Sequence, residues 1–327
     1  MEKREVFARM GELSDTRFAV ATVVGTKGST PREAGAKMVI RGDGSFFGTI
    51  GGGCGEAEVW AEARRALRTG ENSRVLVDLT ESADEGGEKI CGGKMDVLVD
   101  VWEPSHTALL KQILGDVHGQ VLATWVKTGR KALVEDPRTG LVELDGEEVF
   151  LERLERPPLL IVVGAGHVAQ PLVSFAHRLG FRVAVLDDRP EWATVERFRD
   201  ADTVLSGAVS DNLRGFALQP GTYVVLVTRG HKYDEEALRV CLPYPLSYVG
   251  MIGSKRRVRA VFTDLEREGW TAEQLDKVYS PIGLDIGAET PEEIAVAILA
   301  EIIKLRRGRG KGESLSVRSA GSPGPRP

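Results

Sequence analysis

The spacing of hydrophobic residues changes near the middle of the chain. Up to Arg156, short apolar runs rich in β-branched residues are mixed with a few segments of helical spacing. After Pro157-Pro158, apolar runs and amphipathic helical segments alternate regularly. Mixed elements are typical of an α+β domain, and regular alternation builds an α/β domain with a parallel sheet. The pattern therefore predicts an N-terminal α+β domain over residues 1–156 and a C-terminal α/β domain over residues 157–309, joined at Arg156-Pro157-Pro158.

In the N-terminal half, Gly42-Asp43-Gly44 lies between two apolar runs and predicts a hairpin. The turn residues 136–140 predict a second hairpin within residues 131–144, which would finish the domain. The remaining assignments follow from apolar periodicity and glycine stops. Strands are expected at 17–26, 36–41, 45–51, 73–80, 95–102 and 121–126, and helices at 5–13, 56–70 and 106–115.

In the C-terminal half, buried-type strands lead into helices, as parallel sheets require. Strands are expected at 159–165, 181–188, 201–207, 221–230 and 248–253, and helices at 167–180, 233–241, 254–268 and 290–306.

A glycine-rich turn, residues 164–169, follows the first of these strands and opens the first helix. Gly164 permits the tight turn, Gly166 lets the backbone approach a pyrophosphate, and the small Ala169 allows close packing of helix on strand. The helix start offers free N–H groups to an anion, which His167 could help to hold. The second strand ends in Asp187-Asp188, where an acid would bind a ribose hydroxyl.

These features predict a Rossmann-like domain with a parallel sheet. The candidate cofactor-binding residues of this turn are Gly164, Gly166, His167, Ala169 and Asp187. The alternatives are a strand–helix junction without a ligand, a structural His167 and a surface carboxylate at Asp187.

Two of the three cysteines lie in glycine-rich loops. Gly52 and Gly53 precede Cys54 at an expected helix start, where the helix dipole favours a thiolate. Cys91 precedes a second glycine pair, and neither cysteine has the Cys-x-x-Cys spacing of a zinc site. If the fold brings Cys54 and Cys91 together, they could bind a soft metal or a sulfur-bearing ligand, or form a redox pair. The alternative is that both are inert; Cys241, in an apolar helix-like run, is expected to be buried.

A second turn with the character of an anion site lies at residues 248–257, where a strand leads to Ser254, Lys255 and two arginines. Ser254 is a candidate helix N-cap, and a capped helix start flanked by cations can hold a phosphate. Arg229 and His231 follow another strand, at the sheet edge where Rossmann-like folds place ligands. Ser254, Lys255, Arg229 and His231 are therefore candidate binding residues. The alternatives are a capped helix with solvated basic residues and a helix cap formed by Asp234.

Composition excludes several classes of protein. The formal net charge of −5 over 327 residues argues against a nucleic-acid binder. From Lys304 onward seven cations face one acid in a Gly-, Ser- and Pro-rich stretch, which predicts a disordered basic tail over residues 310–327. Three cysteines suggest a reducing cytosol. With no signal-peptide core and no apolar run near about 18 residues, the sequence predicts a cytoplasmic protein without a membrane span.

Taken together, these motifs resemble the XdhC/CoxI family of accessory proteins. The segments that carry the resemblance are GTKGSTPREAGAKMVI (25–40), GTIGGGCGEAEV (48–59), ICGG (90–93), IVVGAGHVAQPL (161–172), VLDDRPEWA (185–193), TRGHKYDEEAL (228–238), YVGMIGSKRR (248–257) and SPIGLDIGAETPEEIAVAILAEII (280–303). The family matures molybdenum hydroxylases such as xanthine dehydrogenase and carbon monoxide dehydrogenase.

The resemblance implies a chaperone that binds molybdenum cofactor of the molybdopterin type, supports its sulfuration and delivers it to the hydroxylase apo-enzyme. It also implies a cysteine desulfurase-type sulfur donor as a partner, and a homodimer. Ser29, Arg32 and Lys37 match the family's N-terminal loop and are candidates for contact with the pterin phosphate. Some members have another residue after the glycine triplet, so Cys54 is not a universal requirement, and no catalytic residue carries over.

A cofactor-insertion chaperone is thus favoured over a turnover enzyme. The alternative is an NAD(P)-dependent oxidoreductase that uses the same glycine-rich turn, with His231 or Lys232 as proton donor. A third hypothesis makes the Rossmann-like half a redox or nucleotide sensor. Aromatic residues make up only 6% of the chain, so Trp60, Trp192 and Tyr233 are the candidates for stacking on a pterin.

Overall fold

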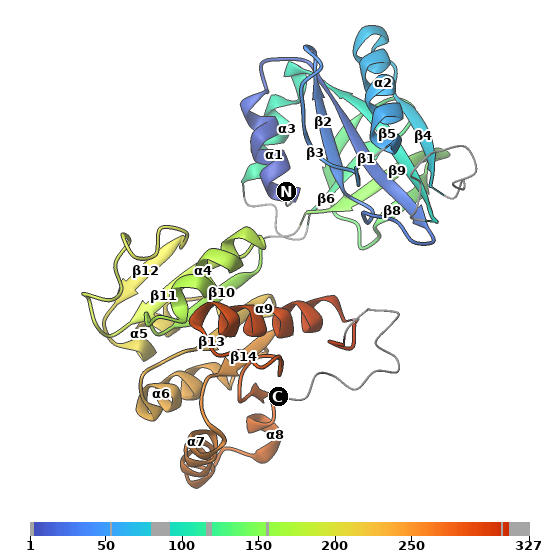
Figure 1. Cartoon of the computed structure of the whole chain (residues 1–327). Helices are drawn as coiled ribbons and strands as arrows, with labels where there is room; N and C mark the ends of the chain where they lie inside the picture. Colours follow the sequence, from blue (N-terminus) through green and yellow to red (C-terminus); the bar gives the residue numbers. More distant parts are fainter. Residues whose placement is uncertain are drawn as a thin grey trace. The chain divides into compact units, whose positions relative to one another are not determined.

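The computed structural model describes residues 3–52, 54–79, 92–115, 120–154, 157–308 and 310–313. The chain divides into two compact units, residues 1–156 and 157–327 (Figure 1). Over the described ranges, no helix is long and apolar enough to cross a bilayer.

The first unit is built around a five-stranded antiparallel sheet. The order is β3-β2-β1-β5-β4, and the expected hairpin at Gly42–Gly44 joins β2 to β3, pairing Ile40 with Phe46. The strands are β1 (Phe18–Lys27), β2 (Lys37–Arg41), β3 (Phe46–Gly48), β4 (Ser73–Asp78) and β5 (Lys94–Trp102).

Successive side chains of each strand point to opposite faces of this sheet, and helices cover both faces. Ala19 and Ala21 of β1 pack against α2 (Cys54–Thr69), whereas Phe18 and Val20 face α1 (Lys3–Glu12) and α3 (Thr107–Leu114). A 3₁₀ turn (Pro104–His106) leads into α3.

A second antiparallel sheet completes the unit, in the order β7-β6-β9-β8. Its strands are β6 (Val121–Trp125), β7 (Lys131–Val134), β8 (Gly140–Leu144) and β9 (Glu147–Arg153). The hairpin expected within residues 131–144 is wrong, because β7 and β8 lie at opposite edges. Strand β9, which the sequence pattern did not predict, pairs with both β6 and β8. The turn that forms the hairpin is Asp145-Gly146, with positive φ at both residues, which is a strong two-residue hairpin signal.

The second unit contains a six-stranded parallel sheet in the order β12-β11-β10-β13-β14-β15. In chain order this is 3-2-1-4-5-6, the order of a Rossmann fold. The prediction of a Rossmann-like C-terminal domain beside an N-terminal α+β domain is therefore confirmed. The strands are β10 (Leu159–Val163), β11 (Arg182–Asp187), β12 (Thr203–Ser206), β13 (Thr222–Leu226), β14 (Tyr248–Met251) and β15 (Val278–Tyr279).

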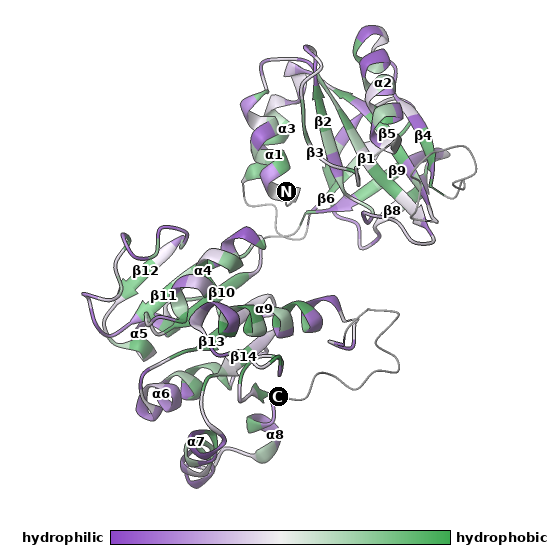
Figure 2. Ribbon diagram, viewed as in Figure 1, coloured by the Kyte–Doolittle hydropathy of each residue, from purple (hydrophilic) through white to green (hydrophobic). Residues whose placement is uncertain are grey.

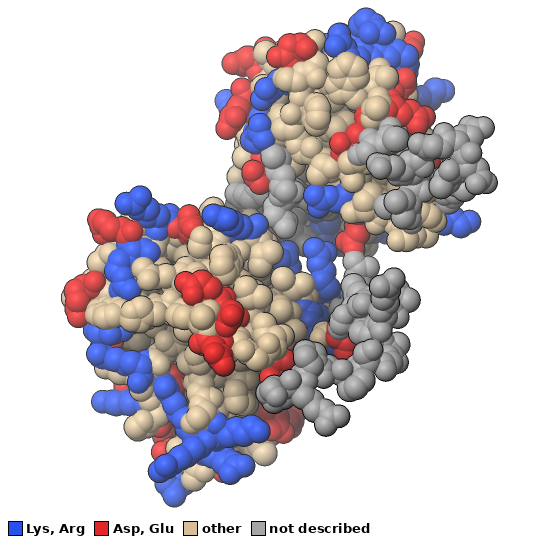
Figure 3. All heavy atoms as spheres, viewed as in Figure 1, with Lys and Arg blue, Asp and Glu red and all other residues tan. Residues whose placement is uncertain are grey.

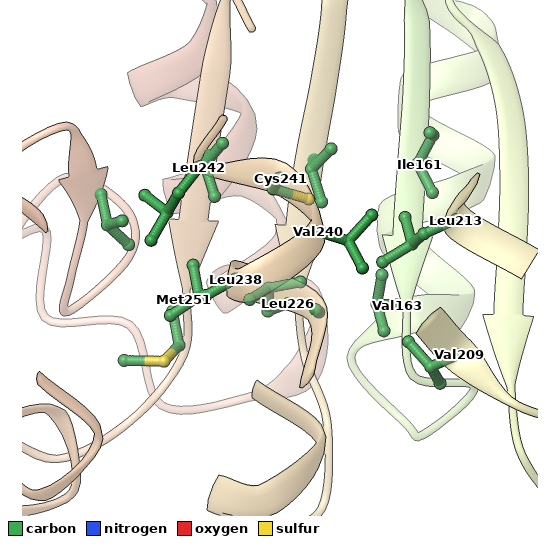
Figure 4. Packing of buried hydrophobic residues seen from close by; sticks show 14 of the residues in the cluster. Ile161, Val163, Val209, Leu213, Leu226, Leu238, Val240, Cys241, Leu242 and Met251 are labelled. Carbon is green, nitrogen blue, oxygen red and sulfur yellow. The ribbon is translucent and has the colours of Figure 1, made fainter. Parts of the chain in front are cut away.

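Helices cover both faces of the parallel sheet, and the strands are accordingly apolar on both sides (Figure 2). Helices α4 (Ala169–Arg178) and α9 (Pro291–Arg307) cover one face. On the other lie α5 (Val209–Arg214), α6 (His231–Cys241), α7 (Lys255–Arg267) and α8 (Ala272–Leu275). Of these elements, α5, α8 and β15 were missed from sequence. Figure 4 shows the hydrophobic cluster on the face covered by α5, α6, α7 and α8, where Ile161 and Val163 of β10 belong to the same cluster as Leu238 and Cys241 of α6.

Candidate functional site

The two glycines of the turn after β10 differ in their surroundings. Gly164 has φ +109°, and a Cβ there would lie 2.5 Å from the carbonyl oxygen of Val227. Gly166 has no such constraint, since a Cβ there would meet nothing within 4 Å. Helix α4 begins at the fully buried Ala169, and the first N–H groups of a helix have no acceptor inside it. The turn thus needs Gly164 for packing, and leaves open space beside Gly166 at a helix start.

Asp187, the last residue of β11, is buried and holds the glycine-rich turn. Its Oδ2 accepts from the Ala165 amide at 2.7 Å and from Nη2 of Arg189 at 2.9 Å. Its Oδ1 accepts from Nε and from the amide of Arg189 at 2.8 and 3.0 Å. Burial by itself raises the pKa of Asp187, but the hydrogen bonds from Arg189 and Ala165 outweigh it and lower the pKa to about 2. Both oxygens of this predicted ribose ligand therefore bond protein donors.

The neighbouring acid, Asp188, faces the end of β13 instead. Its Oδ2 accepts from Nη2 of Arg229 at 2.7 Å and from the hydroxyl of Tyr233 at 2.9 Å. Arg229 also donates to the Tyr233 oxygen at 2.8 Å. We call these three residues the Asp188–Arg229–Tyr233 triangle. Arg229 lies in the loop between β13 and α6, Tyr233 in the first turn of α6, and Asp188 directly after β11, so the triangle bridges the carboxyl ends of two strands.

The triangle borders a small hollow where the strand order reverses between β10 and β13, the place at which Rossmann folds bind ligands. Its volume is about 10 Å³, roughly the space of one water molecule. The residues that line this switch-point hollow are Val163, Gly164, Asp187, Asp188, Val209, Thr228, Arg229 and Tyr233.

Asp234, the residue after Tyr233 in α6, is a buried carboxylate. Asp234 is fully buried and accepts from the hydroxyl of Thr228 at 2.6 Å and from Nε and Nη2 of Arg257 at 3.0 and 2.5 Å. Burial raises the pKa of Asp234, against the opposing hydrogen bonds. The expected helix cap by Asp234 is wrong, because the N-cap of α6 is Gly230. Asp234 instead ties α6 to α7 and to the end of β13.

The second predicted anion turn lies at the start of α7. Ser254 is its N-cap, as expected, and accepts from the amide of Arg257 at 3.3 Å. Lys255 is exposed, and so is His231 at the start of α6. Figure 3 shows Lys and Arg side chains gathered over the α7 end of this unit.

His167 is exposed and contacts Trp192 edge to face, with ring centroids 5.9 Å apart. The guanidinium groups of Arg189 and Arg197 lie 4.5 and 4.4 Å from the centre of the Trp192 ring. Trp192 is therefore already stacked against two cations. The other stacking candidates also have partners: Trp60 donates to the carbonyl of Gly44 at 3.0 Å, and Tyr233 belongs to the triangle.

In the N-terminal unit, the loop before α2 is ordered by one carboxylate. Oε1 of Glu56 accepts from the hydroxyl of Thr49 at 2.6 Å and from the amides of Ile50 and Gly52 at 3.1 and 2.9 Å. A Cβ on Gly51 would lie 2.3 Å from Pro31, so the glycine loop packs on the loop that follows β1. Glu56 was missed from sequence, although an acid in the first turn of a helix after a glycine run is a capping signal.

The loop after β1 also packs on the glycine pair before β5. A Cβ on Gly93 would lie 2.3 Å from the carbonyl oxygen of Ser29. The structure thus brings together the loops at residues 28–31, 49–52 and 92–93. Arg32 is exposed in this corner.

The prediction that Lys37 contacts a phosphate is wrong. Its ammonium group is buried and pairs with Glu152 at 2.8 Å while donating to Thr22 at 3.1 Å. Lys37 therefore joins β2 of one sheet to β9 of the other and does not face solvent.

Gly53 and Cys91 lie outside the described residues, and Cys54 is described only as the first residue of α2. Cys241 is fully buried, as expected, and burial raises the pKa of its thiol to about 12. Within the described ranges, no cluster of three or more His, Cys, Asp or Glu side chains could hold a metal ion.

Similarity to known proteins covers both units. The chain is 29% identical over 322 residues to a probable xanthine dehydrogenase subunit of Bacillus subtilis strain 168, covering 90% of this chain and 95% of that protein. It is 25% identical over 315 residues to the molybdenum cofactor insertion chaperone PaoD of Escherichia coli strain K12, covering 92% and 87%. A crystal structure of a xanthine dehydrogenase from Bacillus halodurans superposes with a TM-score of 0.81 at 28% identity, over 96% of this chain and 98% of that chain.

A further match is the uncharacterized protein YqeB of Escherichia coli strain K12, at 28% identity over 310 residues. It covers 94% of this chain and 47% of YqeB, so the chain spans about half the length of that relative. Two family models match as well. The model of the XdhC Rossmann domain matches residues 160–302, and the model of the XdhC and CoxI family matches residues 13–79. Since each unit carries one of these matches, the chain belongs to the XdhC and CoxI family.

Proposed function

We propose that this protein binds molybdenum cofactor and passes it to a molybdenum hydroxylase of the xanthine dehydrogenase or carbon monoxide dehydrogenase type. The observation that carries the proposal is the open space beside Gly166 at the start of α4, which we call the cradle, in a chain whose two units both match a molybdenum cofactor insertion chaperone. The protein acts as a chaperone in this proposal, and not as a turnover enzyme.

The residues of the cradle fit the phosphate of a pterin. A methyl group at Gly166 would project into open space, so an anion can approach the backbone there. The N–H groups at the start of α4 favour negative charge, and the exposed His167 lies beside them. These residues would hold the phosphate, while the bound cofactor itself supplies the molybdenum centre that the hydroxylase uses.

The N-terminal corner supports a second part of the proposal, which concerns sulfur. Cys54 begins α2 directly after the loop ordered by Glu56, and a helix start favours a thiolate. Gly92 and Gly93, which follow Cys91 in sequence, pack on the neighbouring loop. We assign Gly52, Gly53, Cys54 and Cys91 to the binding of the cofactor during its sulfuration, with a cysteine desulfurase-type protein as sulfur donor. The low cysteine count fits a reducing cytoplasm, and we propose a homodimer as the acting form.

The alternative, an NAD(P)-dependent oxidoreductase, is less well supported. Asp187, the acid that would bind the ribose of NAD(P), accepts hydrogen bonds from the protein's own donors at both carboxylate oxygens. The volume of the switch-point hollow is also far smaller than the roughly 300–1,000 Å³ of typical ligand pockets. These two features argue against NAD(P) as the ligand at this position.

The decisive experiment measures what the full chain retains. We expect protein produced in cells that make molybdenum cofactor to co-purify with pterin, detected by the fluorescence of its oxidised form, and with molybdenum, detected by mass spectrometry. Cys54→Ala and Cys91→Ala should each lower pterin retention several-fold at a nearly unchanged thermal midpoint. The matched control is Cys241→Ala, which removes a thiol from the core and should keep its pterin. Substrate-dependent hydride transfer with tight NAD(P) binding and no retained pterin would overturn the proposal.

A further inference from the structure

One side of α9 carries apolar side chains that face solvent. Val296 is 48% exposed and Ile303 is 38% exposed. They are seven positions apart, which is about two helical turns, so they lie on the same side of the helix. The residues that bury the other side in the core are Ala295, Ile298 and Ile302. Helix α9 therefore packs one side on the parallel sheet and turns a second apolar side outward.

Charged residues continue this outer side toward both ends of α9. Steps of three or four residues keep a position on one side of a helix, and such steps lead back to Glu292 in the first turn and on to Arg307 in the last. Both residues are exposed. Ala300, between Val296 and Ile303, is small enough for another helix to approach closely. We call residues 292, 296, 300, 303 and 307 the α9 stripe; it begins acidic, is apolar in the middle and ends basic.

The α9 stripe is complementary to itself when it is reversed. In two antiparallel copies of α9 with a twofold axis at the middle of the helix, Glu292 of each copy lies opposite Arg307 of the other. The same axis places Val296 opposite Ile303, since both pairs are centred between positions 299 and 300. A twofold interface uses the same patch on both subunits, so a second copy supplies all three zones in the required order. The order of charges thus favours a second copy over an unrelated protein.

We infer that the α9 stripe is the surface through which two copies of this chain associate, with their α9 helices packed antiparallel about a twofold axis. The inference rests on the proposed function in one respect: it gives the homodimer proposed there its interface. The contact lies on the face of the parallel sheet that α4 and α9 cover, and it leaves the face covered by α5, α6, α7 and α8 outside the interface.

The test measures the mass of the purified full chain by sedimentation equilibrium over a series of concentrations. A pair of 17-residue helices, each about 25 Å long, makes a small contact, so the wild-type dimer should dissociate on dilution. Glu292→Lys places like positive charges at both ends of the contact, and Arg307→Glu places like negative charges there. Each variant should dimerise about tenfold more weakly than wild type.

Mixing these two variants restores opposite charges at both ends, so a heterodimer should form with the affinity of the wild-type dimer. The double variant should recover the homodimer for the same reason. Val296→Glu tests the apolar middle and should also weaken the dimer. Its matched control is Val195→Glu, because Val195 is an exposed valine between β11 and β12, and this variant should dimerise as wild type does. Circular dichroism checks that every variant keeps its thermal midpoint.

Three outcomes would overturn the inference. If neither charge reversal nor Val296→Glu weakens the dimer, the copies associate through another surface, and the homodimer of the proposed function stands without this interface. If the mixed charge variants stay monomeric, the antiparallel arrangement is wrong. A wild type that is monomeric at every concentration would overturn both the interface and the homodimer. Pterin retention is measured separately and decides on the cofactor-binding part of the proposed function.

Discussion

The two glycines of the turn after β10 serve different purposes, and substitution separates them. In Gly164→Ala the new methyl group meets the Val227 carbonyl at a positive φ, so we expect the free energy of unfolding to fall by about 1–3 kcal/mol. In Gly166→Ala the methyl group enters open space. Stability should then stay within about 0.5 kcal/mol of wild type, while phosphate affinity falls about tenfold, or about 1.4 kcal/mol.

Denaturant unfolding measures the first quantity and calorimetry with inorganic phosphate the second. If Gly166→Ala binds phosphate with the affinity of wild type, Gly166 does not contribute to the phosphate site.

Asp187 predicts a specific acid response. Its pKa in the folded protein is about 2, below the value of about 3.9 for an unfolded aspartate. A lowered pKa stabilises the fold at pH values above the unfolded pKa, and this contribution is lost as the pH falls from about 4 to about 2. Asp187→Asn should therefore lower the free energy of unfolding by about 2 kcal/mol at pH 7, and the difference from wild type should shrink across that acid range.

Urea unfolding at a series of pH values measures the difference, with Asp211→Asn as control because the Asp211–Arg214 pair is exposed. A wild-type advantage that stays constant down to pH 2 would contradict the assignment of the low pKa to Asp187.

At this scale the sequence predicts backbone requirements better than side-chain partners. The spacing of Gly164, Gly166 and Ala169 after a strand is enough to place the turn, because few residue types satisfy those backbone positions. Asp187 and Asp188 look equivalent in sequence, and their partners depend on where β11 ends and on two arginines that lie far apart in the chain, Arg189 and Arg229. The sequence suggests a solvent-exposed Lys37 because its buried partner, Glu152, lies on a strand far along the chain.

At the scale of elements, the first unit joins its two sheets through buried charges. Lys131 of β7 pairs with Asp100 of β5 at 2.8 Å and donates to the carbonyls of Val101 and Gly129. Lys131→Met leaves Asp100 buried and unpaired, so we expect a loss of about 3–5 kcal/mol in the free energy of unfolding. Adding Asp100→Leu should restore most of it, because a buried pair can be replaced by apolar side chains.

Chemical unfolding of the two single variants and the double variant completes a mutant cycle. Arg138→Met is the control, as its partner Asp136 lies in an exposed turn of the same sheet, and it should change stability by less than about 1 kcal/mol. A double variant no more stable than Lys131→Met would refute the account.

Strands with strong local signals are the ones the sequence predicts well. β1, β5 and β10 carry strong apolar signals, and the alternation of strands and helices predicts the parallel sheet of the second unit, although not its sixth strand, β15. The wrong hairpin arose because Pro137 and Gly140 attract a turn assignment, whereas the turn that pairs strands is Asp145-Gly146. Short elements such as α5 and β15 carry too few residues for a periodic signal.

At the scale of the whole molecule, the hydrophobic clusters do not cross the boundary between the units. In the described ranges, every residue of four clusters falls within residues 1–156, and every residue of the other two falls beyond Pro157. Each unit therefore buries its own core, which is the physical condition for folding alone. The glycine-rich turn at residues 164–169, the triangle and the Asp234–Arg257 pair all belong to the second unit.

A fragment of residues 157–313 should thus fold by itself and keep the phosphate affinity of the full chain. We expect a single cooperative thermal transition by circular dichroism and a phosphate affinity within twofold of the full chain. A fragment that unfolds without cooperativity would show that the second core depends on the first unit. A folded fragment that does not bind phosphate would contradict the assignment of the phosphate to the start of α4.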